Sequence, residues 1–328
     1  MALMHLPHFD QGRLPDPFDA ADLKIFEALR ENGRMSGREI AERSGISEAN
    51  VSRRLAKLVD DHALHVRGFV PPALMGLHAQ GLLLLRCKGD PGPSAAHLAK
   101  NPHIHWCGTA FGAFDIIAYF AVATTQDVVS MVDHLVANDG NLTSVMIAPI
   151  LEVWSPRESD RTGPVVPRPD LRGTHHFDAI DRSMVRCLQL DGRASFADLA
   201  EATGISATSA ADRFRRLQTA GVVQIIALPD PLRLGQLVQG TACLRVSGSI
   251  RAVMEGVARL GKSGWILGAG GPFGVIADLF VSDEAELNAW RSAALHLPGV
   301  SGIEICLHRA IHRQDYAWDF VDAEPAAK

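Results

Sequence analysis

The segment RMSGREIAERSGISEANVSRRLAKL, from Arg34 to Leu58, decides the fold of this chain. It predicts two short helices joined by a tight turn at Ser44-Gly45, with Ser47 as an N-cap whose hydroxyl accepts a hydrogen bond from the second helix. Apolar residues at positions 51, 55 and 58 give that second helix one buried stripe, and its opposite face is basic. This pattern is typical of a helix-turn-helix, with an ordinary helical hairpin as the alternative.

The same pattern returns further along the chain without a gap. The first copy reads FDAADLKIFEALRENGRMSGREIAERSGIS from residue 18, and the second reads FDAIDRSMVRCLQLDGRASFADLAEATGIS from residue 177. The offset of 159 residues (177 − 18) also carries Arg54 onto Arg213 and Trp106 onto Trp265. Because this period is the length of a domain, the sequence predicts duplication of a whole module and not a solenoid.

Composition narrows the class of protein. The chain has 328 residues, of which 47% are hydrophobic, enough for two or more packed domains. Its five cysteines form no CxxC pair, which fits a reducing cytosol. We find no signal-peptide pattern and no apolar run as long as a membrane span, so we expect a cytoplasmic protein without a membrane partner. The net charge of −5 disfavours wholesale coating of nucleic acid but permits a local basic face.

Each copy changes from helical to strand-rich spacing after its helix-turn-helix. The strand-rich part reads β-α-β-β-α-β, the ferredoxin-like arrangement, and a short strand before it reads as the wing of a winged helix. The fold class is therefore α+β, with two winged helix-turn-helix domains alternating with two ferredoxin-like, ACT-like effector domains. The predicted domains are an N-terminal tail (1–17), winged helix-turn-helix 1 (18–70), effector domain 1 (71–155), a linker (156–176), winged helix-turn-helix 2 (177–229), effector domain 2 (230–313) and a C-terminal tail (314–328), whose aromatic start is expected to dock on the body.

These motifs resemble those of the Lrp/AsnC (feast/famine) transcriptional regulators. The resemblance rests on D-x-x-D, L-x-x-x-G-R-x-S, G-I-S and R-x-x-x-L, followed by a ferredoxin-like half with a G-x-x-D turn, here Gly112 to Asp115. Members usually carry one copy, so this chain looks like two fused protomers. The resemblance implies a regulator whose winged helices bind double-stranded DNA and whose ferredoxin-like domains pair around a small effector, commonly an amino acid. It implies no catalytic residue, cofactor or metal.

The candidate DNA-binding residues lie at the start of or along the second helix of each helix-turn-helix. They are Ser47, Asn50, Ser52, Arg53, Arg54, Lys57, Ser206, Thr208, Ser209, Arg213, Arg215 and Arg216. Each helix-turn-helix, with the helix before it, is called a head below. The heads differ, because Asp212 stands where the first copy has Arg53. A carboxylate near the phosphates weakens binding, so we expect the first head to read bases and the second to position the duplex. The alternative is that Asp212 pairs with Arg215 or Arg216 at little cost.

The candidate effector-binding residues surround the turn between the second and third strands of each ferredoxin-like half. They are Thr109, Gly112, Phe114, Asp115, Gly270 and Gly271. The carboxylate of Asp115 can accept a hydrogen bond from an ammonium or hydroxyl group, whereas the second copy has Gly274 there. The first segment reads equally well as a tight turn without a ligand, with Asp115 bonding only its own backbone, and for the second segment that interpretation is favoured.

Three further patterns leave alternatives open. His103 and His105 point to one face of a strand and can hold a metal, but no third ligand is evident, which favours a surface pair or one ordered by backbone. Trp106 and Trp265 belong in the core or a domain interface, with a pocket wall as the alternative. Exposed edges of the ferredoxin-like sheets favour a homo-oligomer formed through these domains.

The leading alternative function is enzymatic. Sirohaem decarboxylases have the same two-domain build, work as paired or fused subunits and engage a tetrapyrrole through histidine and arginine side chains. The basic helix around Arg53, Arg54 and Lys57 favours the regulator, because an enzyme has no reason to keep it. A modulator that no longer binds DNA and only pairs with other family members is the third interpretation.

Overall fold

The computed structural model describes residues 16–154, 175–315 and 317–321, so the two tails and the predicted linker lie largely outside the described residues. The first copy contains α1 (Ala20–Glu31), α2 (Gly37–Ser44), α3 (Glu48–Asp60), β1 (Leu64–Phe69), η2 (Pro72–Met75), β2 (Ala79–Cys87), α4 (Gly92–Leu98), β3 (Ile104–Phe111), β4 (Ile116–Val122), α5 (Thr125–Asn138) and β5 (Leu142–Trp154). The second contains α6 (Ala179–Leu190), α7 (Phe196–Thr203), α8 (Ala207–Thr219), β6 (Gln224–Pro229), η3 (Pro231–Leu234), β7 (Val238–Val246), α9 (Ile250–Leu260), β8 (Ile266–Ala269), β9 (Val275–Val281), α10 (Glu284–Leu295) and β10 (Val300–Gln314). This order confirms the predicted α+β class.

Short-range capping explains where the helices of the two heads begin and end. Capping boxes start α1, α2, α6 and α7, formed by Asp19 with Asp22, Ser36 with Glu39, Asp178 with Asp181 and Ser195 with Asp198. Gly45 and Gly204 end α2 and α7 with φ of 71° and 69°, a left-handed conformation that glycine adopts without penalty. Ser47 is the N-cap residue of α3, but its hydroxyl makes no capping hydrogen bond, so that expected bond is wrong. Ser206, at the equivalent place in α8, does accept one from the Ser209 N–H.

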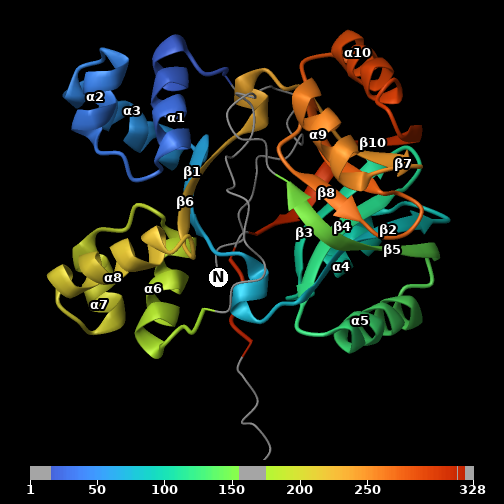
Figure 1. Cartoon of the computed structure of the whole chain (residues 1–328), viewed down its shortest axis with the longest axis horizontal. Helices are drawn as coiled ribbons and strands as arrows, with labels where there is room; N and C mark the ends of the chain where they lie inside the picture. The colour runs from blue at the N-terminus through green and yellow to red at the C-terminus, as the bar shows by residue number, and fades with distance from the viewer. Residues whose placement is uncertain (1–15, 155–174, 316, 322–328) are drawn as a thin grey trace, which may run out of the picture.

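The two strands expected as wings pair with each other across the two copies. β1 and β6 form a two-stranded antiparallel ribbon, with Leu64 opposite Pro229. In Figure 1 this ribbon lies between the heads and the ferredoxin-like halves. Gly33 lies so close to it that a Cβ atom there would be 2.6 Å from a methyl group of Ile225, and one on Gly192 would be 2.9 Å from the Arg67 backbone. The repeated glycine is therefore required by the packing of each head on the ribbon.

The two ferredoxin-like halves join into one closed barrel. Its strand order is β10-β3-β4-β2-β5-β8-β9-β7. Each half keeps the predicted ferredoxin-like order, and its two outer strands pair with the other half, β3 with β10 and β5 with β8. Within the described residues, the strand edges expected to be exposed are therefore hydrogen-bonded to the other half of the barrel. These edges give no support to a homo-oligomer, and the oligomeric state stays a prediction.

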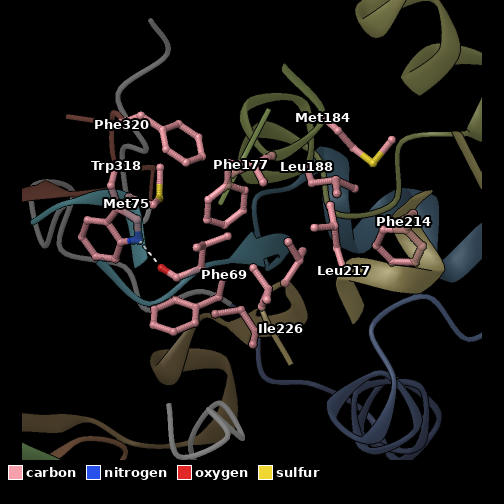
Figure 2. Close-up of a cluster of buried hydrophobic side chains, with 14 of the residues drawn as sticks. Phe69, Met75, Phe177, Met184, Leu188, Phe214, Leu217, Ile226, Trp318 and Phe320 are labelled. Carbon is pink, nitrogen blue, oxygen red and sulfur yellow. Dashed lines mark hydrogen bonds between the residues drawn. The ribbon is translucent and has the colours of Figure 1, made fainter. Parts of the chain in front are cut away.

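Helices and the C-terminal segment complete the packing. The outside of the barrel is covered by α4 and α5 on the first half and by α9 and α10 on the second. Trp318 and Phe320 are buried, 5% and 8% exposed, and the Trp318 indole N–H donates to the Val70 carbonyl at 2.9 Å. Figure 2 shows both rings gathered beside Phe69 and Phe177, which confirms that the start of the tail docks on the body. No helix in the described ranges is long and apolar enough to cross a membrane.

Candidate nucleic-acid interface and internal cavity

An arginine fixes the recognition helix, which is α3 in head 1 (α1–α3) and α8 in head 2 (α6–α8). Arg54 donates from Nη1 to Asp19 Oδ2 at 2.7 Å and to Asp22 Oδ1 at 2.8 Å. Arg213 makes the same two bonds, at 2.6 and 2.8 Å, to the aspartates that begin α6. These guanidinium groups hold each recognition helix against the first helix of its head. Their predicted contact with DNA stays a prediction, and the structure gives them a positioning role that the sequence analysis missed.

The outward face of α3 presents the remaining candidates of head 1 to solvent. Arg53, Lys57 and Ser52 are exposed. Arg53 Nη2 donates to Asn50 Oδ1 at 2.8 Å, one turn earlier on the helix. Because the Arg53–Asn50 bond is exposed, both groups can exchange it for a phosphate or a base edge.

The outward face of α8 is partly neutralised. Asp212 Oδ1 accepts a hydrogen bond from Arg215 Nη1 at 2.6 Å, in an exposed pair three residues apart. The alternative considered for Asp212, a pair on its own helix, is thus observed. Arg216 and Thr208 are exposed, whereas the Ser206 hydroxyl caps the helix and lies 2.8 Å from the Ser209 hydroxyl. On its outward face α8 thus combines Asp212 with Arg215 and Arg216, whereas α3 presents Arg53 and Lys57.

A reciprocal pair of arginine contacts holds the two heads together. Arg34 donates from Nη1 to the Gly192 carbonyl at 2.9 Å and from Nη2 to the Ala194 carbonyl at 2.8 Å. Arg193 makes the mirrored contacts, at 2.7 and 3.1 Å, to two carbonyls in the α1–α2 loop. This arginine clasp relates the heads by an approximate twofold axis, the arrangement that suits two half-sites on DNA. In the sequence, the only indication of this contact is that the pair Gly33-Arg34 recurs as Gly192-Arg193.

The clasp is unequal in one respect. The Arg34 guanidinium lies over the rings of Phe196 and Phe214, 5.0 and 4.9 Å from their centroids. At the positions equivalent by the 159-residue offset, head 1 has Gly37 and Leu55, so Arg193 meets no ring there. Burial in this interface lowers the pKa of Arg34.

The residues predicted to bind an effector lie at one end of the barrel, around the β3–β4 and β8–β9 turns. The Asp115 carboxylate accepts a hydrogen bond from the Cys87 backbone N–H at 2.8 Å. Phe114 is buried edge-on against Phe273, with 6.0 Å between ring centroids. Gly112 has a φ of 140° and approaches β10 so closely that a Cβ there would lie 2.3 Å from a carbonyl oxygen.

The other three predicted effector residues are similarly placed. Thr109 is 4% exposed, and the Gly270 N–H donates to the Pro149 carbonyl at 2.8 Å. Gly271 is exposed with a φ of 96°. None of the six residues lines the internal cavity described next. Their role in effector binding stays a prediction, and the backbone partner of Asp115 lies on β2 and not in its own turn.

A cavity of about 230 Å³ lies at the other end of the barrel, between the barrel and the β1–β6 ribbon. Both copies line it with equivalent residues: Pro72 and Pro231, Gln80 and Gln239, Trp106 and Trp265, and Ile117 and Ile276. The two tryptophans thus form a pocket wall at a domain interface, which combines two of the interpretations left open for them. No local sequence pattern predicts this cavity, because its walls meet only after the two copies have paired.

The polar groups of the cavity differ between its two sides. The Tyr119 hydroxyl donates to Gln80 Oε1 at 2.8 Å on the side of the first copy. On the side of the second copy the Thr241 hydroxyl lies 2.9 Å from His308 Nε2, and Asp278 Oδ1 accepts a hydrogen bond from the Trp265 backbone N–H. Burial raises the pKa of Asp278 to about 7 and also raises that of Tyr119.

Three histidines line the same cavity in neutral form. Burial lowers the pKa of His65 and of His308 to about 4, and that of His105 to about 3. No lysine or arginine is among the cavity-lining residues in the described ranges. His103, the expected companion of His105, is exposed, and the described residues contain no group of three or more potential metal ligands.

Comparison with known proteins supports the assignment of both heads. An AsnC-type helix-turn-helix domain matches residues 177–218, and a winged helix-turn-helix DNA-binding domain matches residues 18–62. The chain is 41% identical over 118 residues to the proline dehydrogenase transcriptional activator of Rhizobium radiobacter, covering 34% of this chain and 74% of that protein. It is 24% identical over 140 residues to the HTH-type transcriptional regulator FL11 of Pyrococcus horikoshii, covering 42% of this chain and 93% of that protein.

A solved structure matches the duplicated architecture as a whole. The siroheme decarboxylase NirDL superimposes with a TM-score of 0.64 at 13% identity, covering 92% of this chain and 94% of that one. At this identity the likeness shows the fold alone. Both heads match helix-turn-helix family models, and the chain covers 74% of a regulator to which it is 41% identical. The chain therefore belongs, as a tandem duplication, to the Lrp/AsnC family of helix-turn-helix transcriptional regulators.

Proposed function

We propose that the protein is a cytoplasmic, sequence-specific transcriptional regulator that engages two DNA half-sites with one chain. The observation that carries the proposal is the outward face of α3, where Arg53 and Lys57 are exposed on a helix anchored from behind by Arg54. Such side chains contact phosphates and base edges. The arginine clasp supports it further, since it presents two recognition helices as a symmetric pair without a second chain.

The two heads have different tasks in this proposal. Head 1 reads bases through Asn50, Ser52 and Arg53, with Lys57 on the backbone. Head 2 positions the duplex, because its Asp212–Arg215 pair cancels charge at the place where head 1 has Arg53. The start of α8 adds hydroxyl groups that can bond phosphates. Control by a small-molecule effector such as an amino acid is part of the proposal, supported by the family to which the chain belongs.

The test is capture of genomic DNA fragments by the purified full-length protein at two salt concentrations. Arg53→Ala/Lys57→Ala is compared with Arg215→Ala/Arg216→Ala and with a control, Arg259→Ala/Arg291→Ala, which removes two exposed charges from α9 and α10. We expect a defined site to be enriched, with at least tenfold weaker binding for the head 1 variant. The salt slope of that variant should fall by about 1, the value of the single phosphate contact assigned to Lys57.

The controls define the outcome. The head 2 variant should lose less affinity than the head 1 variant, and the α9/α10 variant should bind as the wild type does. If the wild type enriches no site above random DNA, the proposal is overturned. If all three variants lose the same affinity, binding is a matter of overall charge and the proposed reading face is wrong.

One observation favours a second candidate, a tetrapyrrole enzyme. The whole chain shares its fold with NirDL, a siroheme decarboxylase also solved in complex with an iron-uroporphyrin III analogue, and the cavity contains three histidines. Uroporphyrins, however, carry many carboxylates, and such groups need cationic partners when buried. The cavity-lining residues that the structure describes include no lysine or arginine. Titration with iron-uroporphyrin III discriminates, because a saturable shift of its Soret band would favour the enzyme.

A further inference from the structure

The internal cavity has aromatic walls on several sides. Trp106 and Trp265 face it from the two halves of the barrel, and Phe69 and Trp318 contribute from the ribbon and the C-terminal segment. The Phe69 ring lies 5.8 Å from that of Trp265 and 6.2 Å from that of Trp318. The electron-rich faces of such rings attract organic cations, most strongly where water is excluded.

Two buried polar atoms on the cavity wall have no partner. His65 and His105 are 7% and 5% exposed, and both line the cavity. His65 Nε2 and His105 Nδ1 make no hydrogen bond. Buried polar atoms are nearly always paired, so two such atoms around one cavity point to a ligand that supplies the missing partners.

The charges of the lining select the kind of ligand. The Asp315 carboxylate is compensated by Arg313, whose Nη2 lies 3.3 Å from Asp315 Oδ2. Asp278 accepts a backbone hydrogen bond but faces no lysine or arginine among the cavity-lining residues in the described ranges. The three histidines stay neutral at pH 7, since burial holds their pKa at about 3 to 4. Among the cavity-lining residues a cation therefore finds the Asp278 carboxylate, whereas an anion finds no lysine or arginine. Arg67 and Arg313, whose charges help to lower the pKa of His65 and of His105, are not among the lining residues.

We propose that this cavity binds a small organic cation, an ammonium group on an aromatic or branched apolar body, with Asp278 as counter-ion and Trp106 and Trp265 as walls. The volume of about 230 Å³ limits that body. It admits one ring with a short side chain. The neutral histidines would accept hydrogen bonds from the ammonium group, and the site is separate from both recognition helices and from the β3–β4 turn.

The test uses three probes of matched size, 2-phenylethylamine, 2-phenylethanol and phenylacetate. Binding to the full chain at pH 7.5 is followed by tryptophan fluorescence and calorimetry. We expect saturable binding of 2-phenylethylamine at least tenfold tighter than that of phenylacetate. Asp278→Asn should weaken the amine at least tenfold and change the affinity for 2-phenylethanol less than threefold. Asp319→Asn, which removes an exposed carboxylate near the C-terminus, is the matched control and should bind all three as the wild type does.

Each contrary result is decisive. Equal or tighter binding of phenylacetate overturns the proposal, as does saturable binding of none of the probes. An unchanged amine affinity in Asp278→Asn removes Asp278 as counter-ion and overturns it too. If Asp278→Asn does not fold, Trp265→Leu tests the wall instead, and it should weaken the amine and the alcohol alike. No arm contains DNA, so failure here leaves the proposed regulator standing, and failure of DNA capture leaves this site standing.

Discussion

In both copies of the module an arginine on the recognition helix, Arg54 or Arg213, grips the two aspartates that begin the first helix of the head. Capping boxes and a left-handed glycine recur at the same places. The outward faces have diverged, since α3 exposes Arg53 where α8 carries Asp212 paired with Arg215. The duplication has therefore kept what positions each helix and changed what the helix presents.

The two sides of the internal cavity show the same separation. The paired glutamines, tryptophans and isoleucines keep its frame. Tyr119, which bonds Gln80, is replaced by Asp278 at the equivalent position, and His105 by Gly264. The equivalent positions of the two copies thus differ in charge, because the second copy has a carboxylate, Asp278, where the first has the Tyr119 hydroxyl. Three predictions sharpen or break the contrast between the copies.

The largest effect is expected for Asp278→Asn as a function of pH, without ligand. Burial raises the pKa of this carboxyl to about 7, above its value near 4 in an unfolded chain. Its contribution to stability is thus full below pH 4 and is lost as the pH rises through 7. The free energy of unfolding of Asp278→Asn, relative to wild type, should rise by about 4 kcal/mol between pH 4 and pH 8.

Urea unfolding at several pH values measures this difference, and effects of the three buried histidines cancel because both proteins contain them. Asp319→Asn, at an exposed position, serves as the control for loss of a carboxylate. A constant offset for Asp278→Asn would mean that the two sides of the cavity are electrostatically equivalent.

An intermediate effect is expected at the arginine clasp. Arg34→Ala leaves the Gly192 and Ala194 carbonyls without their charged donor and uncovers two rings, so it should lower the free energy of unfolding by about 3 kcal/mol. Arg193→Ala breaks two similar hydrogen bonds but no ring contact, and should cost about 1 kcal/mol less. Chemical denaturation of both variants measures the gap. Equal losses would show that the rings add nothing to the clasp.

The smallest effect is expected for Asp212→Asn in head 2. The substitution removes a negative charge near the DNA phosphates and releases Arg215 from its exposed pair. We expect DNA affinity to rise about threefold at low salt, with a steeper salt dependence. Fluorescence anisotropy with the captured site measures it, and Glu284→Gln on α10 serves as a control for charge alone. An unchanged affinity would place head 2 away from the duplex.

Local sequence patterns were sufficient to predict much of the fold. Apolar spacing and the turn at Ser44-Gly45 predicted the helix-turn-helix, the repeat extended that prediction to the second head, and the change to strand-rich spacing predicted the ferredoxin-like order. The partners of β1 and β6 could not be predicted in this way, because a short apolar strand does not specify which copy it pairs with. Closure of the barrel was missed for the same reason.

The candidate site was only partly predictable. Exposure of Arg53 and Lys57 follows from the helical period, but the period does not show that Arg54, on the same helix, is occupied by Asp19 and Asp22. The cavity is formed by residues such as Trp106 and Asp278, which are distant in sequence and individually unremarkable as core positions. Its polar groups become informative only once burial and missing partners are known.

The pairing of β1 with β6, and of β3 with β10, has a consequence for how the chain is made. Strand partners as far apart in sequence as Leu64 and Pro229 must meet, which makes loop closure costly and folding slow. While the chain is being synthesised, the first copy has to wait with open strand edges until the second copy is complete. Those edges are sites for chaperones and for aggregation. A chain that stops after the first copy leaves the edges of β3 and β5 without their partners, which favours association with a second such chain or aggregation.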